Sequence, residues 1–306
     1  MTVRPLALLD LPYLYGFREE AVGLDTARWL TRGNPLGAVG LMSYVNPARH
    51  IYSAIANGEN ASVLGGITHA RDETFAKLYY LAPASQLDHP LLLDLIENLA
   101  HQAGTWGAFH VLAEVNETSP AFLLLRKAGF AVYAWQRMWD VSEVAGTGSG
   151  SVWMRVKSVH LPAIQSLYHQ IVPPLLQPVE PQPQKALGWM CNEGVKCYVG
   201  VSHGMYGIVL TPLIHPEAAN VSEKLSALIG SLPGRRSRPV YICVRSYQAW
   251  LEPVLEDLGA KAGERQAVMV KHLTHTVKEA AVARASRPAG VSIQPSRVSR
   301  VERKKP

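Results

Sequence analysis

The chain has 306 residues, of which 48% are hydrophobic and 18% are charged. This composition can bury apolar cores, so it excludes a wholly disordered chain, and the length suits two domains of about 150 residues each. No run approaches about 18 uninterrupted apolar residues, which excludes a transmembrane helix, and the first residues lack the apolar stretch and cleavage site of a signal peptide. We therefore expect a cytoplasmic protein with no membrane partner.

The net charge of +6 is concentrated at the C-terminus. Thr276–Pro306 contains eight Lys or Arg against two Glu, so the rest of the chain is neutral. We expect this basic tail to be disordered. We expect no nucleic-acid partner except through this tail, whose Lys and Arg side chains could contact phosphates. The tail lacks the aromatic residues that stack on bases, and a solubilising disordered terminus is the alternative interpretation.

Three cysteines, Cys191, Cys197 and Cys243, give an odd number without the spacing of a zinc knuckle or a redox pair. Reduced, buried thiols of a cytoplasmic protein are the simplest interpretation. The histidines form no His-x-His or His-Glu-x-x-His pattern, so we predict no metal site.

Strand and helix patterns alternate through the first half of the chain. Alternating apolar residues predict strands, and apolar residues three or four apart predict helices. Helix-start and helix-stop residues set the boundaries. In chain order we predict a strand at 3–6, helices at 9–20 and 25–32, strands at 50–57, 63–69 and 75–81, a helix from Pro90 to Gly104, a strand at 109–115, a helix from Ser119 to Gly129, and a strand at 130–141.

The second half repeats this order. Asn116 lies 13 residues before the helix-stop Gly129, and Arg245 lies 14 residues before the corresponding Gly259. A duplicated domain with a mixed strand-and-helix sheet is the economical explanation. The predicted elements are a strand at 152–157, a helix at 160–171, strands at 195–201 and 205–210, a helix over 221–230, a strand at 240–244, a helix at 246–259, and a strand at 266–272.

A Gly/Ser-rich run at 145–151 separates the two halves. Small flexible residues of this kind are typical of a linker. We therefore predict a domain at 1–144, a linker at 145–151, a second domain at 152–275 and the basic tail at 276–306.

The run AEVNETSPAFLLLRKAGF at 113–130 resembles the late strand–helix–Gly-Phe segment of the GNAT superfamily of N-acetyltransferases. The opening Val3-Arg4-Pro5, followed by Leu9-Asp10-Leu11, is similar to that family's common start. The resemblance covers residues 1–142 by motif and 152–274 through the order of elements. It implies an α/β fold class, with a mixed sheet in each of two tandem GNAT-like domains. It also implies acetyl transfer from acetyl-CoA to an amine of a small molecule or peptide.

The family binds acetyl-CoA with a Gln/Arg-x-x-Gly-x-Gly/Ala loop, whose backbone N–H groups and helix N-terminus hold the pyrophosphate. Here Gln86 falls on the first position, while His89 and Leu91 replace the glycines beside the acidic Asp88. The corresponding loop at 214–220 also lacks glycine. The resemblance implies pantetheine along the backbone of strand 75–81 and cofactor contacts at Leu81, Pro83, Gln86, His89, Leu91, Leu92, Asn116 and Ser119.

Acetyl transfer needs a base to take the proton of the amine. Glu114, near a strand end, is the best-placed carboxylate, and Tyr133 is the candidate proton donor. The family's usual acid, a tyrosine four residues before the Gly of Gly-Phe, is replaced by Leu125 and Leu255. The alternatives also stand: Glu114 as a solvated acid, Tyr133 as a packing residue.

Arg245, with Tyr241 and Tyr247, forms the analogous polar cluster in the second half, where it holds a phosphate or forms a surface salt bridge. Two functions therefore remain open for the whole chain. The first is an N-acetyltransferase whose second domain completes the acceptor pocket or acts as a pseudo-dimer partner. The second is a catalytically inactive GNAT-fold module that binds a ligand or partner, which the missing glycines and tyrosine favour.

Overall fold

The structure is a computed structural model. It describes residues 2–7, 10, 15–37, 49–59, 61–146, 152–183, 187–191 and 195–273. The chain divides into a compact unit, Met1–Thr274, and the segment His275–Pro306. Residues 11–14 of the first predicted helix, most of the predicted linker (147–151) and the predicted tail lie outside the described residues. No helix of the described part has the length and apolar character needed to cross a membrane.

Most elements of the first half form where the sequence predicts them. Asp25 accepts a hydrogen bond from the Arg28 amide and begins α2, and Ser119 begins α5 in the same way through Ala121. Gly129, with a φ of 85°, follows α5 in the left-handed conformation that favours glycine. The elements are β1 (Thr2–Pro5), η2 (Arg18–Glu20), β2 (Val22–Gly23), α2 (Thr26–Arg32), β3 (Arg49–Asn57), β4 (Ser62–Ala70), β5 (Phe75–Ala82), η4 (Ala84–Gln86), α4 (Leu91–Thr105), β6 (His110–Asn116), α5 (Pro120–Lys127) and β7 (Ala131–Asp140).

The second half repeats the pattern with some shifted boundaries. The strand predicted at 205–210 lies at Ile208–Ile214, and the last strand begins at Lys261 rather than Gln266. A short strand, Gly188–Cys191, was not predicted. The elements are β8 (Trp153–Arg155), η6 (Ser158–His160), α6 (Leu161–Ile171), β9 (Gly188–Cys191), β10 (Cys197–His203), β11 (Ile208–Ile214), α7 (Val221–Ser231), β12 (Val240–Arg245), η7 (Ser246–Gln248), α8 (Leu251–Asp257) and β13 (Lys261–His272).

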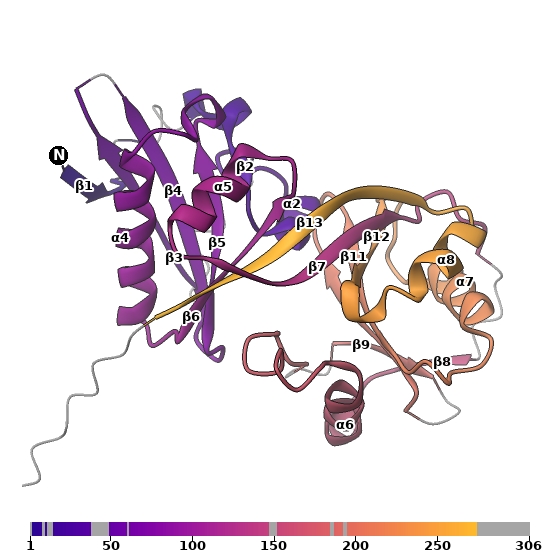
Figure 1. Cartoon of the computed structure of the whole chain (residues 1–306). Coiled ribbons are helices and arrows are strands. Elements are labelled where there is room, and N and C mark those ends of the chain that lie inside the picture. Colours follow the sequence, from indigo (N-terminus) through magenta and orange to yellow (C-terminus); the bar gives the residue numbers. More distant parts are fainter. Residues whose placement is uncertain are drawn as a thin grey trace, which may run out of the picture. The chain divides into compact units, whose positions relative to one another are not determined.

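The two halves exchange their last strands within one mixed sheet (Figure 1). The strand order is β1-β3-β4-β5-β6-β13-β7-β12-β11-β10-β9-β8, with β2 paired to β5. Thus β13, from the end of the second half, lies between β6 and β7 of the first, and β7 pairs with β12 of the second. The predicted α/β class with a mixed sheet is confirmed, while the exact domain boundaries stay a prediction.

Each half has its own apolar core on one face of the sheet. In the first half α4 buries Leu92, Leu95 and Leu99 completely against strand residues such as Ile67 and Leu78. In the second half α7 and α8 contribute in the same way, with Leu225, Leu228, Leu251 and Leu255. Burying such a side chain is worth about 1.5–3 kcal/mol, so these helix faces hold the sheet from one side. On the other side α6 packs Ile164 and Leu167 against part of the second half's strands.

Candidate functional site

In each half, two neighbouring parallel strands pair only at their beginning. β5 and β6 pair from Phe75 to Lys77, and β11 and β12 pair from Ile208 to Leu210. Beyond these points each strand runs on without pairing to the other, to Ala82, Asn116, Ile214 and Arg245. Each pair therefore opens into a gap whose edges carry backbone groups that need hydrogen-bond partners.

The chain itself fills the first gap. β2 pairs antiparallel with β5, Val22 opposite Leu81 and Gly23 opposite Tyr80. The Leu24 amide then donates to the Tyr79 carbonyl at 2.9 Å, and the Leu24 carbonyl accepts from the Glu114 amide at 2.9 Å. Leu24 thus bridges the two separated strands with its backbone. The free edge of strand 75–81, on which the predicted pantetheine site depended, is already paired in this structure.

A single side chain closes the second gap. Oε1 of Gln248 accepts from the Ile214 amide at 3.0 Å, and Nε2 donates to the Pro212 carbonyl at 2.9 Å. Gln248 is 1% exposed. A primary amide carries the same acceptor and donor as a peptide group, so Gln248 takes the place of a neighbouring strand.

The helix start after the first gap has little free anion-binding capacity. The Leu91 amide donates to Nδ1 of His89 at 3.2 Å, and the amides of Leu92 and Leu93 bond the carbonyls of His89 and Pro90. These are the N–H groups that would otherwise face a phosphate. Nearby, the Ser85 hydroxyl donates to Glu20 at 2.6 Å, which adds a negative charge beside the loop.

The residues predicted to contact a cofactor differ in burial and in hydrogen-bond partners. Leu81, Leu91 and Leu92 are buried in the first core, Pro83 is buried, and Gln86 and His89 are half-buried. Oε1 of Gln86 has no hydrogen-bond partner in the described structure. Asn116 bonds Gln266 and Glu264, and the Ser119 hydroxyl caps α5. Their predicted role in cofactor binding remains a prediction.

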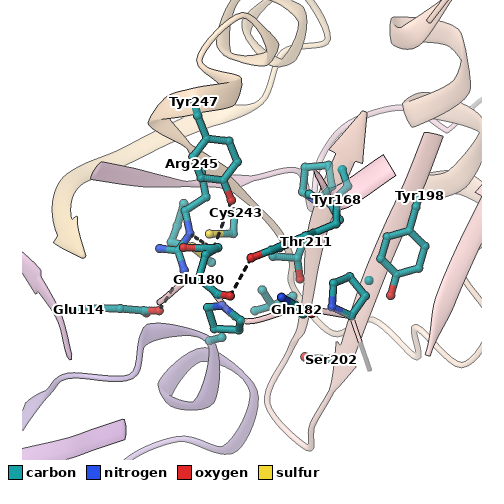
Figure 2. A pocket seen from close by; sticks show the side chains of 18 of the residues that line it. Glu114, Tyr168, Glu180, Gln182, Tyr198, Ser202, Thr211, Cys243, Arg245 and Tyr247 are labelled. Atoms are coloured by element: carbon teal, nitrogen blue, oxygen red, sulfur yellow. Dashed lines mark hydrogen bonds and ion pairs between the residues drawn. The ribbon is translucent and has the colours of Figure 1, made fainter. Parts of the chain in front are cut away.

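A cavity of about 260 Å³ lies on the opposite side of the sheet from the helices of the second core, and both halves line it (Figure 2). Lys77 and Glu114 come from the first half, and Tyr198, Thr211 and Arg245 come from the second. The segment from Glu180 to Pro183 completes the wall. The structure therefore brings the predicted base Glu114 next to Arg245.

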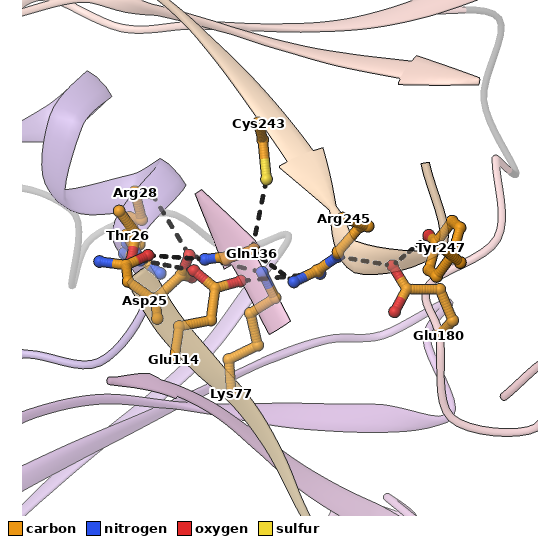
Figure 3. A network of polar contacts seen from close by, with 11 residues as sticks. Asp25, Thr26, Arg28, Lys77, Glu114, Gln136, Glu180, Cys243, Arg245 and Tyr247 are labelled. Carbon is orange, nitrogen blue, oxygen red and sulfur yellow. Dashed lines mark hydrogen bonds and ion pairs between the residues drawn. The ribbon is translucent and has the colours of Figure 1, made fainter. Parts of the chain in front are cut away.

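A buried ion pair holds this wall together (Figure 3). Nε of Arg245 lies 3.0 Å from Oε1 of Glu180, and the Tyr247 hydroxyl donates to the same oxygen at 3.2 Å. Arg245 also lies 3.9 Å from Glu114, whose other oxygen accepts from the Thr26 amide at 2.9 Å. Burial alone would lower the pKa of Arg245, but Glu180 and its other neighbours raise it well above its usual range. The predicted surface salt bridge at Arg245 is therefore wrong, because Arg245 and its partner Glu180 are both buried, each residue being 8% exposed.

The tyrosines around Glu180 are held in their neutral form. Burial, reinforced by the negative charge of Glu180, raises the pKa of both Tyr133 and Tyr247 well above the usual range. Tyr133 packs beside Phe75, Leu112 and Val270. Burial also raises the pKa of Cys243 to about 12, so this thiol is protonated and a poor nucleophile.

Sequence reasoning missed Glu180 and Gln248. Glu180 lies in the run PPLLQPVEPQP, which has no helix or strand period, and the sequence carries no signal for its partner. Gln248 was placed only as part of a helix. The described residues contain no cluster of three potential metal ligands.

No protein-family model matches this chain, and a comparison with curated proteins finds no match. Solved structures do match. A GCN5-related N-acetyltransferase from Sphaerobacter thermophilus is similar with a TM-score of 0.56 and 11% identity, over 89% of this chain and 95% of that one. A tandem GNAT protein of the clavulanic acid biosynthesis pathway, solved without AcCoA, matches with a TM-score of 0.52 and 12% identity, over 90% and 99%. A putative acetyltransferase from Pyrococcus horikoshii matches with a TM-score of 0.52 and 12% identity, over 89% of each chain.

These similarities span both halves, so the chain has the tandem GNAT fold that the sequence resemblance implied. At 11–12% identity they show the fold and leave the activity open.

Proposed function

We propose that this chain is a non-catalytic, ligand-binding module built on the tandem GNAT fold, and that its ligand occupies the cavity beside Glu114 and Arg245. The observation that carries this proposal is that the chain closes both strand gaps itself, with Leu24 in one half and Gln248 in the other. The resemblance to the GNAT superfamily implies that the pantetheine of acetyl-CoA binds the backbone edge of strand 75–81. The part of that edge from Tyr79 to Leu81 is already bonded to Val22–Leu24.

Opening either gap carries an energetic cost. A buried donor or acceptor left without a partner costs about 1–3 kcal/mol. In the first half, displacing Val22–Leu24 breaks the β2–β5 pairing and both bonds of Leu24. In the second, displacing Gln248 breaks two bonds. A cofactor that binds in the gap has to replace all of them before it contributes any affinity.

The cavity has the character of a small-ligand site. Its volume of about 260 Å³ lies just below the roughly 300–1,000 Å³ typical of such pockets. Apolar walls from Met138, Val209 and Leu213 surround a few charged groups, among them Lys77 and Arg245. Thr211 and Ser202 are exposed at its margin, so a ligand has a way in from solvent.

Acetyl transfer is the second candidate, favoured by the fold and by Glu114 lining the cavity. In that function acetyl-CoA would bind through Leu81, Pro83, Gln86, His89, Leu91, Leu92, Asn116 and Ser119. Glu114 would take the proton of an amine acceptor, a small molecule or a peptide, in the cavity that the second half completes. Tyr133, neutral because of its raised pKa, would donate a proton to the leaving thiolate.

Calorimetry with acetyl-CoA and with CoA distinguishes the two functions. We expect no saturable heat up to millimolar cofactor, and no release of CoA thiol when amines are added. Saturable binding to the wild type would overturn the non-catalytic proposal. Weakening of that binding by Gln86→Glu, with Gln165→Glu on the exposed face of α6 as the matched control, would then favour the acetyltransferase.

A further inference from the structure

A second cavity, of about 480 Å³, lies between α2, the strands β4 and β5 of the first half, and β10 of the second. Its charged and polar lining includes Asp25, Arg28, Arg32, Glu73, Lys77 and His203. Neither candidate function uses this cavity, although Lys77 also lines the first one.

Arg28 is the most unusual residue of this cavity. Arg28 is 5% exposed, and its guanidinium carbon lies 4.2 Å from the centre of the Tyr79 ring. None of Nε, Nη1 and Nη2 has a hydrogen-bond partner among the described residues. A guanidinium offers five N–H donors, and leaving them unmatched away from water is costly.

Asp25 balances only part of the local positive charge. Its Oδ1 accepts from the Arg28 backbone amide at 3.3 Å and lies 3.4 Å from Nζ of Lys77, so it makes no hydrogen bond to the guanidinium. Burial alone would raise the pKa of Asp25, but Lys77 and Arg28 lower it, so the carboxylate is charged. Glu73, which is half-buried, is the other acid of the lining.

The ammonium group of Lys77 has N–H donors that no hydrogen bond to a described residue uses. Its side chain is 27% exposed, and its ammonium makes one long contact, with Asp25. The buried Glu114 also lies near Lys77; burial alone would lower the pKa of the ammonium, but Asp25 and Glu114 raise it. No carboxylate among the described residues, however, hydrogen-bonds any of the three guanidinium nitrogens of Arg28. An oxygen-rich anion supplies the acceptors that this region lacks.

We propose that this cavity binds a small oxyanion, a phosphate or carboxylate group, between Arg28 and Lys77. The planar fork of Arg28 binds two oxygens of the anion side by side. The guanidinium is out of contact with bulk water, so the anion enters past the partly exposed Lys77. The site shares Lys77 with the first cavity, but it needs neither that cavity's ligand nor either strand gap.

Thermal unfolding of the full chain tests the site, with inorganic phosphate, citrate and sodium chloride as three arms at matched ionic strength. We expect phosphate or citrate to raise the melting temperature of the wild type in a saturable way, and chloride not to. The arm with the lower apparent Kd identifies the ligand as a phosphate or a carboxylate. Arg28→Gln should weaken binding at least tenfold, and Arg28→Lys, which keeps the charge and loses the fork, should weaken it by less.

Arg126→Gln is the matched control, because Arg126 is exposed on α5 and loses the same charge. Binding should persist in this variant. Without anion, Arg28→Gln should still unfold in one cooperative transition and keep the wild-type circular dichroism spectrum, so loss of binding is not loss of the fold. Equal stabilisation of all variants, or no stabilisation of the wild type by phosphate or citrate, overturns the proposal.

Discussion

Gln136 and Gln266 lie directly opposite each other on β7 and β13, and Nε2 of Gln136 donates to Oε1 of Gln266 at 2.8 Å. Each glutamine also bonds the end of a strand beside it: Gln136 accepts from Nη1 of Arg245, and Gln266 donates to Asn116 at 2.9 Å. Arg245 and Asn116 are thus equivalent in the two halves. The glutamine pair connects their polar groups across the exchanged strands.

Gln136→Ala should lower the free energy of unfolding by about 1–3 kcal/mol, because it removes the hydrogen bonds that Gln136 makes to the buried Arg245 and to Gln266. Urea unfolding measures this change. Gln165→Ala, at an exposed position of α6, should change stability by less than about 0.5 kcal/mol. Equal effects of the two substitutions would contradict a structural role for the glutamine pair.

Breaking the ion pair of Arg245 and Glu180 should be costly, whereas replacing both partners should not. Glu180→Gln removes the charge that compensates a buried guanidinium, for which we expect a loss of about 3–5 kcal/mol. Arg245→Met combined with Glu180→Leu should recover most of that loss, because it removes both charges of the buried pair together. A double-mutant cycle in urea gives the coupling energy, and simple additivity would argue against the pair.

Gln248→Ala should destabilise the second half by about 2–4 kcal/mol, since it leaves the Pro212 carbonyl and the Ile214 amide unpaired. Hydrogen exchange is the direct measurement: the Ile214 amide should exchange much faster, while the Leu64 amide in β4 should not change. Unaltered protection at Ile214 would mean that Gln248 does not act as the missing strand.

Gly23 permits the first gap to be filled. A Cβ at this position would lie 2.3 Å from the Trp29 ring, whereas a Cβ at Gly16 meets nothing within 4 Å. Gly23→Ala should therefore cost roughly 1–3 kcal/mol through overpacking, and Gly16→Ala should be nearly neutral. Melting temperatures of the two variants provide the comparison, and a stable Gly23→Ala protein would show that β2 moves easily.

Cys243 should be inert in the folded protein. Burial raises the pKa of its thiol to about 12, whereas an unfolded cysteine ionises near about pH 8.5. The unfolded chain then binds fewer protons than the folded one above that pH, so stability falls as the pH rises from about 8.5 towards 12. Cys243→Ala should show a shallower decline in urea unfolding. Iodoacetamide at pH 8.5 should label Ser158→Cys, at an exposed position, and leave Cys243 unmodified.

The sequence predicted local structure well where a repeating pattern or a capping residue determined it. The helix α4 follows from the spacing of Leu92, Leu95 and Leu99, and Gly129 and Gly259 mark helix ends with φ values of 85° and 80°. What it could not predict are pairings between distant residues. Nothing in the composition of β13 indicates that it pairs with β6 and β7 rather than with β12.

In the candidate site, too, the sequence indicated a residue from its local position and did not indicate its distant partners. Glu114 was identified because it lies near a strand end, but its neighbour Arg245 comes from the other half and Glu180 from an irregular Pro-rich segment. Residues of this kind meet only in the folded chain, so a sequence pattern carries no trace of the contact. Arg245 was expected at the surface because an isolated arginine usually is, and its burial depends on Glu180.

The exchange of β7 and β13 also makes the sheet of each half depend on strands of the other half. β6 and β7 meet only through β13, so removing the second half would leave both with an unpaired edge, a template for aggregation. We therefore expect neither half to keep its sheet intact when the other is removed. The two halves should therefore unfold together, in one cooperative transition, rather than as two separate domains.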